Sequence, residues 1–424
     1  MDADVIVIGA GIVGCATAYY LAKEGGRVLV VERGGIAAQQ SSRAWGFLRQ
    51  QGRHPGEIPL AREALAMWQG LEAELGAGFE YVRDGILLVA ETEADEARFA
   101  EMKREAAGQG IGVELVARRG LDRFLPEPPA AWRGGLYSPG DGHAEPGLAT
   151  RAFAAAAARL GVAFMTDTPV DAILVRGESV CGVRAGERTL RAPAVFCAAG
   201  LGSQDLLLPH GISLPVQAVR ASVAQTGPAA PRTRVPVWTP RVAYRPKPDG
   251  SFYFSNGYRG VDAEHDLSLR SFRHLADFIP TFMRNWRTIR VSVGPELFDD
   301  LPWPGSARSL RNLWDEPRVN RRLVRRHARC LYEIFPDLEA AGIARAWAGR
   351  IDATPDLIPI IHQPAHVEGL LIATGFNGHG FALAPAVGRQ AARILTGNPE
   401  TVDLKPFRLG RFAETADRPS AAPL

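Results

Sequence analysis

A glycine-rich motif near the start of the sequence has the spacing needed to bind the phosphates of a dinucleotide. It reads Gly9-Ala10-Gly11-Ile12-Val13-Gly14 and follows an apolar run over residues 4–8. The first glycine of such a motif permits a tight turn, the second lets the backbone approach a pyrophosphate, and the third lets helix and strand pack closely. The helix predicted over residues 15–23 would direct its positive end towards the negative charge.

A carboxylate stands where the ribose of such a ligand would lie. Gly25 and Gly26 end the predicted helix, and residues 27–32 read as a second strand that finishes at Glu32. The dinucleotide fingerprint places its ribose-binding acid roughly 20 residues beyond the last glycine, which is close to this position. Because a strand, a helix and an acid all occur at the expected spacing around the glycines, the pattern favours a βαβ unit over an ordinary glycine-rich loop.

Two later apolar runs predict further strands of the same sheet. Residues 194–199 and 370–374 are apolar, and each run is followed by a glycine. Buried parallel strands have this character, and ligands collect at their carboxyl ends. We therefore expect a discontinuous dinucleotide-binding domain over residues 1–85, 144–216 and 342–410. A second, substrate-facing domain is expected over residues 86–143 and 217–341, with a tail from 411 to 424.

Composition excludes several other classes of protein. The chain has 424 residues, of which 46% are hydrophobic and 22% charged, and its formal net charge is +3. These values are typical of a globular protein and lack the basic excess of a nucleic-acid-binding one. The four cysteines do not have metal-ligand spacing, so no metal site is expected. No signal peptide or membrane-spanning run is evident, which predicts a cytoplasmic protein.

Three blocks of the sequence carry a resemblance to a known family. They are residues 4–49, which include Ser41-Ser42 and Trp45-Gly46, residues 347–356, and the segment Gly375-Phe-Asn-Gly-His-Gly-Phe381. With these blocks the chain resembles, over nearly its whole length, the FAD-dependent amine oxidoreductases that include D-amino-acid dehydrogenases, glycine oxidase and sarcosine oxidases. The resemblance implies a Rossmann-like α/β FAD-binding domain, interleaved with an α+β substrate domain built on an antiparallel sheet. It also implies oxidation of a C–N bond.

The resemblance also implies which residues hold FAD. Three glycines before a helix predicted over residues 384–395 suit close approach of the backbone to the flavin ring. Monomeric sarcosine oxidases attach flavin through a cysteine at the position of Gly349, so noncovalent FAD is expected here. The implied cofactor-binding residues are Gly9, Gly11, Ile12, Val13, Gly14, Glu32, Arg33, Ser41, Ser42, Trp45, Gly46, Val170, Ala198, Gly200, Gly375, Asn377, Gly378, His379, Gly380 and Phe381.

Candidate catalytic and substrate residues lie close to these blocks. Arg49 and His379 are the catalytic candidates, although a histidine at a helix start often serves packing alone. Because arginine grips carboxylates in a bidentate manner, the substrate candidates are Arg49, Arg53 and Arg350. Tyr253, on a strand-like segment, could line the pocket, as could Tyr244, but core packing is the alternative for both.

Positions where the chain departs from the family's patterns limit the substrates and electron acceptors that we expect. D-amino-acid dehydrogenases carry their carboxylate arginine where this chain has Ile351, which favours a secondary or N-substituted amino acid resembling sarcosine, proline, iminodiacetate or an opine. Sarcosine oxidases carry a lysine at the position of Ala382. Loss of this cation would slow the reaction with oxygen, which favours a dehydrogenase that passes electrons to a protein or a quinone. Arg259 could substitute for the lysine, so oxygen also stays open as the acceptor.

Several alternatives remain open from the sequence. They are a D-amino-acid dehydrogenase, a flavin subunit that is inactive without its partner, an NAD(P)-linked dehydrogenase, and an aromatic-ring monooxygenase, which would carry Gly-Asp-Ala where this chain has Gly375-Phe-Asn.

The arginine-rich residues 318–329 predict an amphipathic helix with Leu323, Val324 and Leu331 towards the core. Its arginines would form a solvated face or a docking surface for a partner. The oligomeric state is left open.

Overall fold

The computed structural model describes residues 3–230, 232–259, 263–286, 289–293 and 316–414. One sheet within these residues has six strands in the order β20-β21-β12-β1-β2-β8. Strand β1 pairs in parallel with both β2 and β12, and β12 pairs in parallel with β21, which confirms the predicted parallel strands. The bounds of the strands are β1 Val5–Ile8, β2 Val28–Val31, β8 Ala163–Met165, β12 Ala194–Cys197, β20 Ile360–His362 and β21 Leu370–Thr374.

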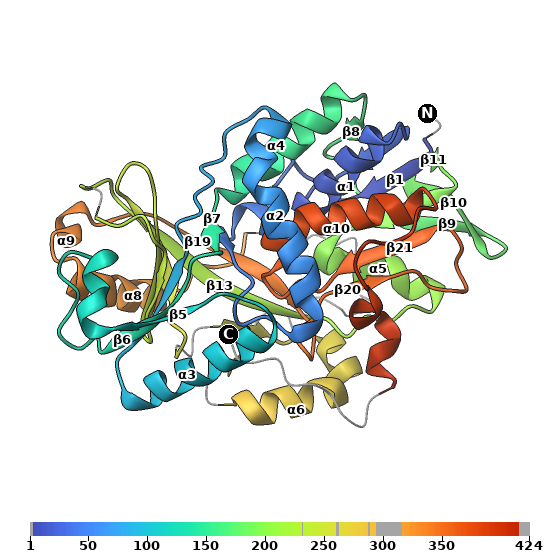
Figure 1. Cartoon of the computed structure of the whole chain (residues 1–424). Helices are drawn as coiled ribbons and strands as arrows, with labels where there is room; N and C mark the ends of the chain where they lie inside the picture. The colour runs from blue at the N-terminus through green and yellow to red at the C-terminus, as the bar shows by residue number, and fades with distance from the viewer. Residues whose placement is uncertain (1–2, 231, 260–262, 287–288, 294–315, 415–424) are drawn as a thin grey trace.

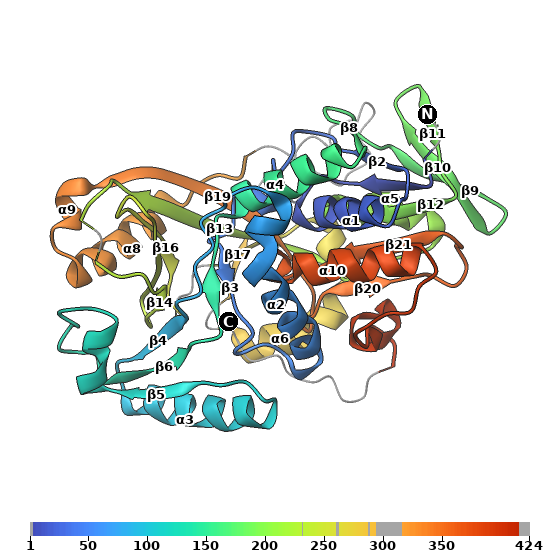
Figure 2. The same cartoon turned by 45° about the horizontal axis from the view of Figure 1, so that its top comes forward.

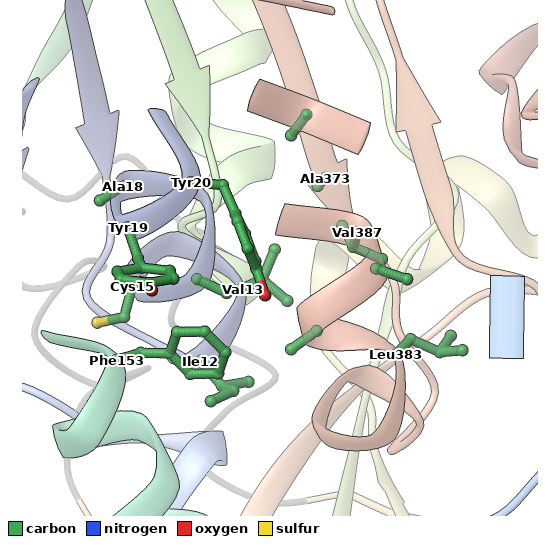
Figure 3. Packing of buried hydrophobic residues seen from close by; sticks show 14 of the residues in the cluster. Ile12, Val13, Cys15, Ala18, Tyr19, Tyr20, Phe153, Ala373, Leu383 and Val387 are labelled. Atoms are coloured by element: carbon green, nitrogen blue, oxygen red, sulfur yellow. The ribbon is translucent and has the colours of Figure 1, made fainter. Parts of the chain in front are cut away.

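The strands of this sheet are apolar because helices cover it. All four residues of β1 are buried, as are all five of β21, which is the pattern of strands enclosed on both faces. Helices α1 (Ile12–Lys23), α4 (Pro146–Arg159) and α10 (Gly380–Leu395) pack together over one face. Figure 3 shows Tyr19 and Tyr20 of α1 lying between Phe153 of α4 and Val387 of α10.

Two of these helices begin earlier than the sequence predicts. Helix α1 starts at Ile12 and not at residue 15, and α10 starts at Gly380 and not at residue 384. The glycines and Pro385 obscured both starts, because these residues are poor helix formers in isolation. Since α1 and α10 pack against each other, tertiary contacts offset the low helix propensity of their first turns.

A second, larger sheet of ten strands in the described residues forms the other part of the molecule. Its order is β18-β17-β13-β16-β15-β14-β4-β6-β5, and β19 pairs with β13. Most neighbours are antiparallel, although β4 with β14 and β17 with β18 are parallel. The bounds are β4 Ile86–Ala90, β5 Glu114–Ala117, β6 Gly134–Ser138, β13 Gln217–Thr226, β14 Val237–Trp238, β15 Val242–Pro246, β16 Phe252–Asn256, β17 Ala263–Asp266, β18 Ile289–Ser292 and β19 Ile343–Ala353.

The remaining elements surround these two sheets. Strands β9 (Ala172–Arg176), β10 (Ser179–Ala185) and β11 (Arg188–Arg191) form a small sheet, and β3 (Phe47–Leu48) pairs with β7 (Gly142–His143). The other helices are α2 Ile58–Leu75, α3 Glu93–Gly108, α5 Ser203–Leu207, α6 Leu275–Asn285, α8 Arg321–Ile334 and α9 Leu338–Ala341. Leu323, Val324 and Leu331 of α8 are buried, as predicted. Residues 415–424 of the predicted tail lie outside the described residues.

The pairing of β13 with β19 connects the two parts of the molecule. The two strands pair antiparallel from Gln217 opposite Ala353 to Thr226 opposite Ile343, and they extend from the large sheet towards α10 (Figures 1 and 2). An α/β part interleaved along the chain with a largely antiparallel part confirms the predicted fold class, while the exact domain boundaries stay a prediction. No helix among the described residues is long and apolar enough to cross a membrane.

Candidate active site

A cavity of about 960 Å³, here called the central cavity, lies between the two large sheets. Its lining includes the turn between β1 and α1, the segment 376–381 before and within α10, and one side of β13. Along β13 the lining residues are Val219, Ala221 and Val223, which alternate because successive strand residues point to opposite faces. The central cavity is therefore built by residues from both parts of the fold.

The glycine motif has the geometry that the sequence predicts. Gly9 has a φ of +104°, and a Cβ atom at Gly14 would lie 2.0 Å from the carbonyl oxygen of Gly9. The backbone N–H of Ile12 donates to the hydroxyl of Ser41 at 2.8 Å. Only glycine at positions 9 and 14 lets the turn and helix approach each other this closely, which leaves the start of α1 open to the cavity.

Glu32 lies at the end of β2 with both carboxylate oxygens engaged. One oxygen accepts the backbone N–H of Ala10 at 2.7 Å, and the other accepts that of Gly34 at 2.8 Å. These bonds fix the carboxylate at the carboxyl end of the strand, where it lines the central cavity. The position suits a hydrogen bond to a ribose hydroxyl.

Most of the predicted cofactor residues line the central cavity together. Two do not. Ser42 lies in a short 3₁₀ turn, where its hydroxyl donates to the carbonyl of Gln39 at 3.2 Å. Gly375 is covered by Thr354, and its N–H donates to Asp352 at 2.7 Å. The residues that line the cavity are Gly9, Gly11, Ile12, Val13, Gly14, Glu32, Arg33, Ser41, Trp45, Gly46, Val170, Ala198, Gly200, Asn377, Gly378, His379, Gly380 and Phe381.

The predicted arginines meet at the same cavity. Arg49 is 8% exposed, and within the described residues its guanidinium has no hydrogen-bond or ion-pair partner. Its Cζ atom lies 4.8 Å from the ring centroid of Trp238. The Nε of Arg53 donates to the backbone carbonyl of Arg49 at 3.4 Å, while its Nη1 is buried without a partner among the described residues. Arg350 also lines the cavity.

His379 is buried beside a carboxylate that sequence reasoning missed. Its Nδ1 lies 3.3 Å from Oε1 of Glu57, and Glu57 is 1% exposed. Burial, reinforced by the charge of Arg53, lowers the pKa of His379 to about 4. Burial alone would raise the pKa of Glu57, but the contacts with His379 and Arg53 hold it below its usual value. At neutral pH the pair is therefore a carboxylate beside a neutral imidazole.

Asp141 is a second missed carboxylate near the arginines. It is 1% exposed and accepts the backbone N–H of Gln50 at 2.9 Å. Burial raises its pKa to about 7, against the opposing effect of that backbone hydrogen bond and of Arg49 and Arg53. No sequence signal identifies Asp141, because it lies in the turn between β6 and β7, far along the chain from residue 49.

The structure does not place Tyr253 where its predicted role needs it, and that role stays a prediction. Tyr253 lies outside the cavity lining, with its ring 5.1 Å from that of Trp347. Its neighbours Phe252 and Phe254 are buried in the core of the large sheet, and strand alternation turns Tyr253 to the other side. Tyr244 is also a core residue, with no exposed surface. Arg259 does line the cavity, but it forms an ion pair with Asp95.

The lining fits the chemistry of FAD. The backbone turn at Gly9–Gly14 has no room for side chains, Glu32 offers a fixed carboxylate, and the first turn of α10 directs the positive end of its helix towards the cavity. Residues 4–394 match the family model described as FAD dependent oxidoreductase. The protein belongs to this family of FAD-dependent enzymes, which confirms the resemblance carried by the sequence motifs.

Individual relatives are similar at low identity. The chain is 26% identical to D-amino acid dehydrogenase of Paramagnetospirillum magneticum, over 96% of this chain and 98% of that protein. It is 26% identical to mitochondrial dimethylglycine dehydrogenase of Mus musculus, of which it spans only 45%. Among solved structures, L-amino acid deaminase from Proteus myxofaciens in complex with anthranilate superposes with a TM-score of 0.88, at 24% identity, over 97% of this chain and 94% of the other.

Proposed function

We propose that this protein oxidises the C–N bond of a secondary or N-substituted amino acid. The substrate would lose a hydride from the carbon next to nitrogen, and the resulting imine would be hydrolysed by water. The observation that carries the proposal is the buried guanidinium of Arg49, which lacks an acidic partner in the described residues and lines the same cavity as the FAD-binding motif. The activities named for the relatives, which act on amino acids or dimethylglycine, support the same class.

In this proposal the FAD lies along the central cavity. The turn at residues 9–14, Glu32 and Ser41 would hold its adenosine and pyrophosphate, and residues 376–381 would contact the flavin ring. When bound, FAD supplies the hydride acceptor. The start of α10 favours negative charge close to it without any titrating group, because the N-terminus of a helix carries a partial positive charge.

The two buried arginines would hold the substrate carboxylate. A buried cation without a partner is costly, so an anionic ligand that completes its hydrogen bonds is strongly favoured. Arg49 provides a planar fork of N–H donors that matches a carboxylate. Arg53, whose Nη1 is also without a partner among the described residues, lies alongside. Fixing the carboxylate would orient the neighbouring C–N bond for reaction.

His379 would orient the reacting groups and not remove a proton. Because its pKa is lowered to about 4, the imidazole is neutral at physiological pH, and the carboxylate of Glu57 is placed to accept a hydrogen bond from Nδ1–H. With so low a pKa, His379 is too weak a base to take up the proton that a substrate ammonium group releases at neutral pH. The positive charge of Arg49 and Arg53 would instead favour binding of the substrate with a neutral amine.

A D-amino acid dehydrogenase is the second candidate. The similarity to such an enzyme along almost its whole length favours it. Against it, Ile351 lines the cavity at the position where that family carries its carboxylate arginine, as judged from the motif. Arg350, the adjacent lining residue, is the group that could replace it.

The absence of lysine from the described lining supports an acceptor other than oxygen. The described lining residues with positive side chains are arginines, and Lys247, the lysine nearest along the chain to this part of the sheet, is bound to Glu80 and Glu145 instead. Without a lysine beside the ring in the described lining, we expect slow reoxidation by oxygen. A quinone or an electron-transfer protein would then accept the electrons.

One experiment tests these proposals together. The FAD-loaded protein is mixed under nitrogen with sarcosine, proline, iminodiacetate, an opine or a D-amino acid, and loss of the visible flavin absorbance is followed by stopped flow. The proposal expects bleaching with at least one N-substituted amino acid and slow peroxide formation on aeration. Bleaching by D-amino acids alone would support the second candidate. No bleaching by any amine would contradict both, and would leave a flavin subunit that needs a partner.

A substitution tests the part assigned to Arg49. Arg49→Lys keeps the charge but loses the planar pair of donors, so we expect the apparent dissociation constant for the amino acid to rise roughly 10- to 100-fold. The measurement is the substrate dependence of the rate of flavin bleaching. An unchanged dissociation constant would show that the carboxylate binds elsewhere.

A further inference from the structure

We propose that Trp238 is a positioning residue for the substrate site: it orients the guanidinium of Arg49 for binding the substrate carboxylate. This inference rests on the proposed function, which it deepens by stating what the site must recognise. The substrate class is amino acids with a free carboxylate, as distinct from simple amines. Sequence reasoning did not identify Trp238, because it lies in a two-residue strand of the large sheet, nearly 200 residues beyond Arg49.

The contact between the two side chains has the geometry of a cation–π interaction. The Cζ atom of Arg49 lies over the Trp238 ring, 4.8 Å from its centroid, and tryptophan is the aromatic residue that attracts cations best. Since no hydrogen bond or ion pair holds the Arg49 guanidinium in the described residues, the contact with the indole ring is an interaction that can orient it. A cation–π contact does not use the N–H donors of the guanidinium, so these donors stay available to bind another ligand.

Trp238 is itself held firmly. It pairs with Ala243 of β15 and with Leu88 of β4, and it is 7% exposed. The rings of Trp45 and Phe47 each lie 6.1 Å from its ring in edge-on arrangements. A side chain enclosed on these sides has little freedom to change rotamer, so it presents a fixed surface to the arginine.

The charges around the pair favour an anion. Burial, and after it the positive charge of Arg53, lowers the pKa of Arg49, while the same charge of Arg53 attracts a carboxylate. The two nearby carboxylates do not neutralise Arg49 by direct contact: Glu57 bonds to His379, and Asp141 accepts a backbone N–H. The structure therefore has an oriented cation with unused donors at the cavity, and a carboxylate is the ligand group that matches its planar fork.

The experiment uses FAD-loaded protein and two probes of the same shape, benzoate and benzamide. Their dissociation constants are measured from changes in the visible flavin spectrum. Trp238→Leu removes the ring, and we expect benzoate to bind about tenfold more weakly while benzamide changes by less than about threefold. Trp238→Phe retains a ring face and should keep benzoate binding within about threefold of the original.

A matched control separates orientation from general packing. Phe252→Leu removes a buried ring from the same sheet at a position outside the cavity lining, and it should lower the melting temperature without changing the benzoate-to-benzamide preference. If Trp238→Leu does not fold, Trp238→Met provides a ring-free side chain of larger volume for the same measurement.

A double substitution gives the decisive result. On an Arg49→Lys background, Trp238→Leu should weaken benzoate binding by less than about threefold, because the oriented group is already gone. The inference is overturned if Trp238→Leu affects benzoate and benzamide equally, if its effect persists in full without Arg49, or if benzoate does not bind the unaltered protein. Bleaching of the flavin by an amino acid in the unaltered protein would show that the proposed function stands even when this inference fails.

Discussion

At the scale of single residues, the central cavity is notable for charge that is buried and only partly balanced. Arg49 and Arg53 are both less than a tenth exposed. Burial raises the pKa of Asp141 to about 7, and Asp141 is close enough to both arginines for their charges to oppose that rise. The charge of Asp141 therefore changes within the physiological range. When Asp141 is ionised, its negative charge offsets the positive charge of the arginines that attracts a carboxylate. When it is protonated, this effect is lost.

This titration predicts a pH dependence for anion binding. Below pH 7 Asp141 is mostly neutral and the arginines attract an anion fully, whereas above pH 7 the ionised carboxylate opposes it. Benzoate stays ionised throughout, so its dissociation constant should rise several-fold between pH 6 and pH 8 in the FAD-loaded protein. In Asp141→Asn, which can still accept the N–H of Gln50, the constant should be flat. A steep pH dependence that survives this substitution would contradict the assignment.

At the scale of elements, the end of the cavity proposed to bind the pyrophosphate of FAD depends on how closely α1 approaches the turn after β1. The start of α1 packs against the turn that follows β1, and Gly14 leaves no room for a side chain because the Gly9 carbonyl occupies that space. The same helix packs on α10, the helix whose first turn contributes to the other end of the cavity (Figure 3). A displacement of α1 would therefore affect both ends.

Substituting this glycine should separate cofactor binding from helix propensity. Gly14→Ala would place a Cβ atom 2.0 Å from the Gly9 oxygen, so α1 must shift, and we expect loss of most bound flavin and a lower melting temperature. Gly70→Ala in α2 is the matched control: no atom lies within 4 Å of its added Cβ, so it should raise stability by up to about 1 kcal/mol. Flavin absorbance per protein and thermal unfolding measure both effects. A normal flavin content in Gly14→Ala would contradict this account of the turn.

At the scale of the whole molecule, buried polar contacts join the large sheet to the α/β part. Arg245 of β15 is 1% exposed; it donates to the carbonyl of Ala144 at 3.1 Å and to the carboxylate of Glu145 at 2.7 Å, next to the start of α4. Lys247 donates to the same Glu145 at 2.9 Å. Together with the β13–β19 pairing, these contacts connect the two parts of the fold that line the cavity.

Removing this connection should cost more than removing an exposed one. Arg245→Met leaves the Ala144 carbonyl without its donor, although Glu145 keeps Lys247, so we expect a loss of roughly 2–4 kcal/mol in the free energy of unfolding. Arg234→Met removes an ion pair with Asp84 whose arginine side chain is 79% exposed, and it should cost less than about 1 kcal/mol. Urea denaturation compares the two. Equal losses would show that the buried contact does not stabilise the junction.

Features that depend on local spacing could be predicted from the sequence. The glycine motif, the acid at Glu32, the parallel strands and the loop before α10 could all be read from residue types and short intervals, because turns and helix starts impose them locally. Arg49, Arg53 and His379 were predicted from their places in or beside the segments that resemble the family. The structure places all three at the central cavity, and their roles stay predictions.

The partners of those residues could not be predicted, because they are brought together by tertiary packing. Glu57, Asp141 and Trp238 come from a helix start, a distant turn and a two-residue strand, and nothing in their local sequence marks them. Tyr253 was predicted to line the pocket and lies outside the cavity lining, because strand alternation fixes only which residues share a face, and not which face meets the cavity. Which groups become buried partners depends on the packing of elements far apart in the chain, and the charge and orientation of the site follow from that packing.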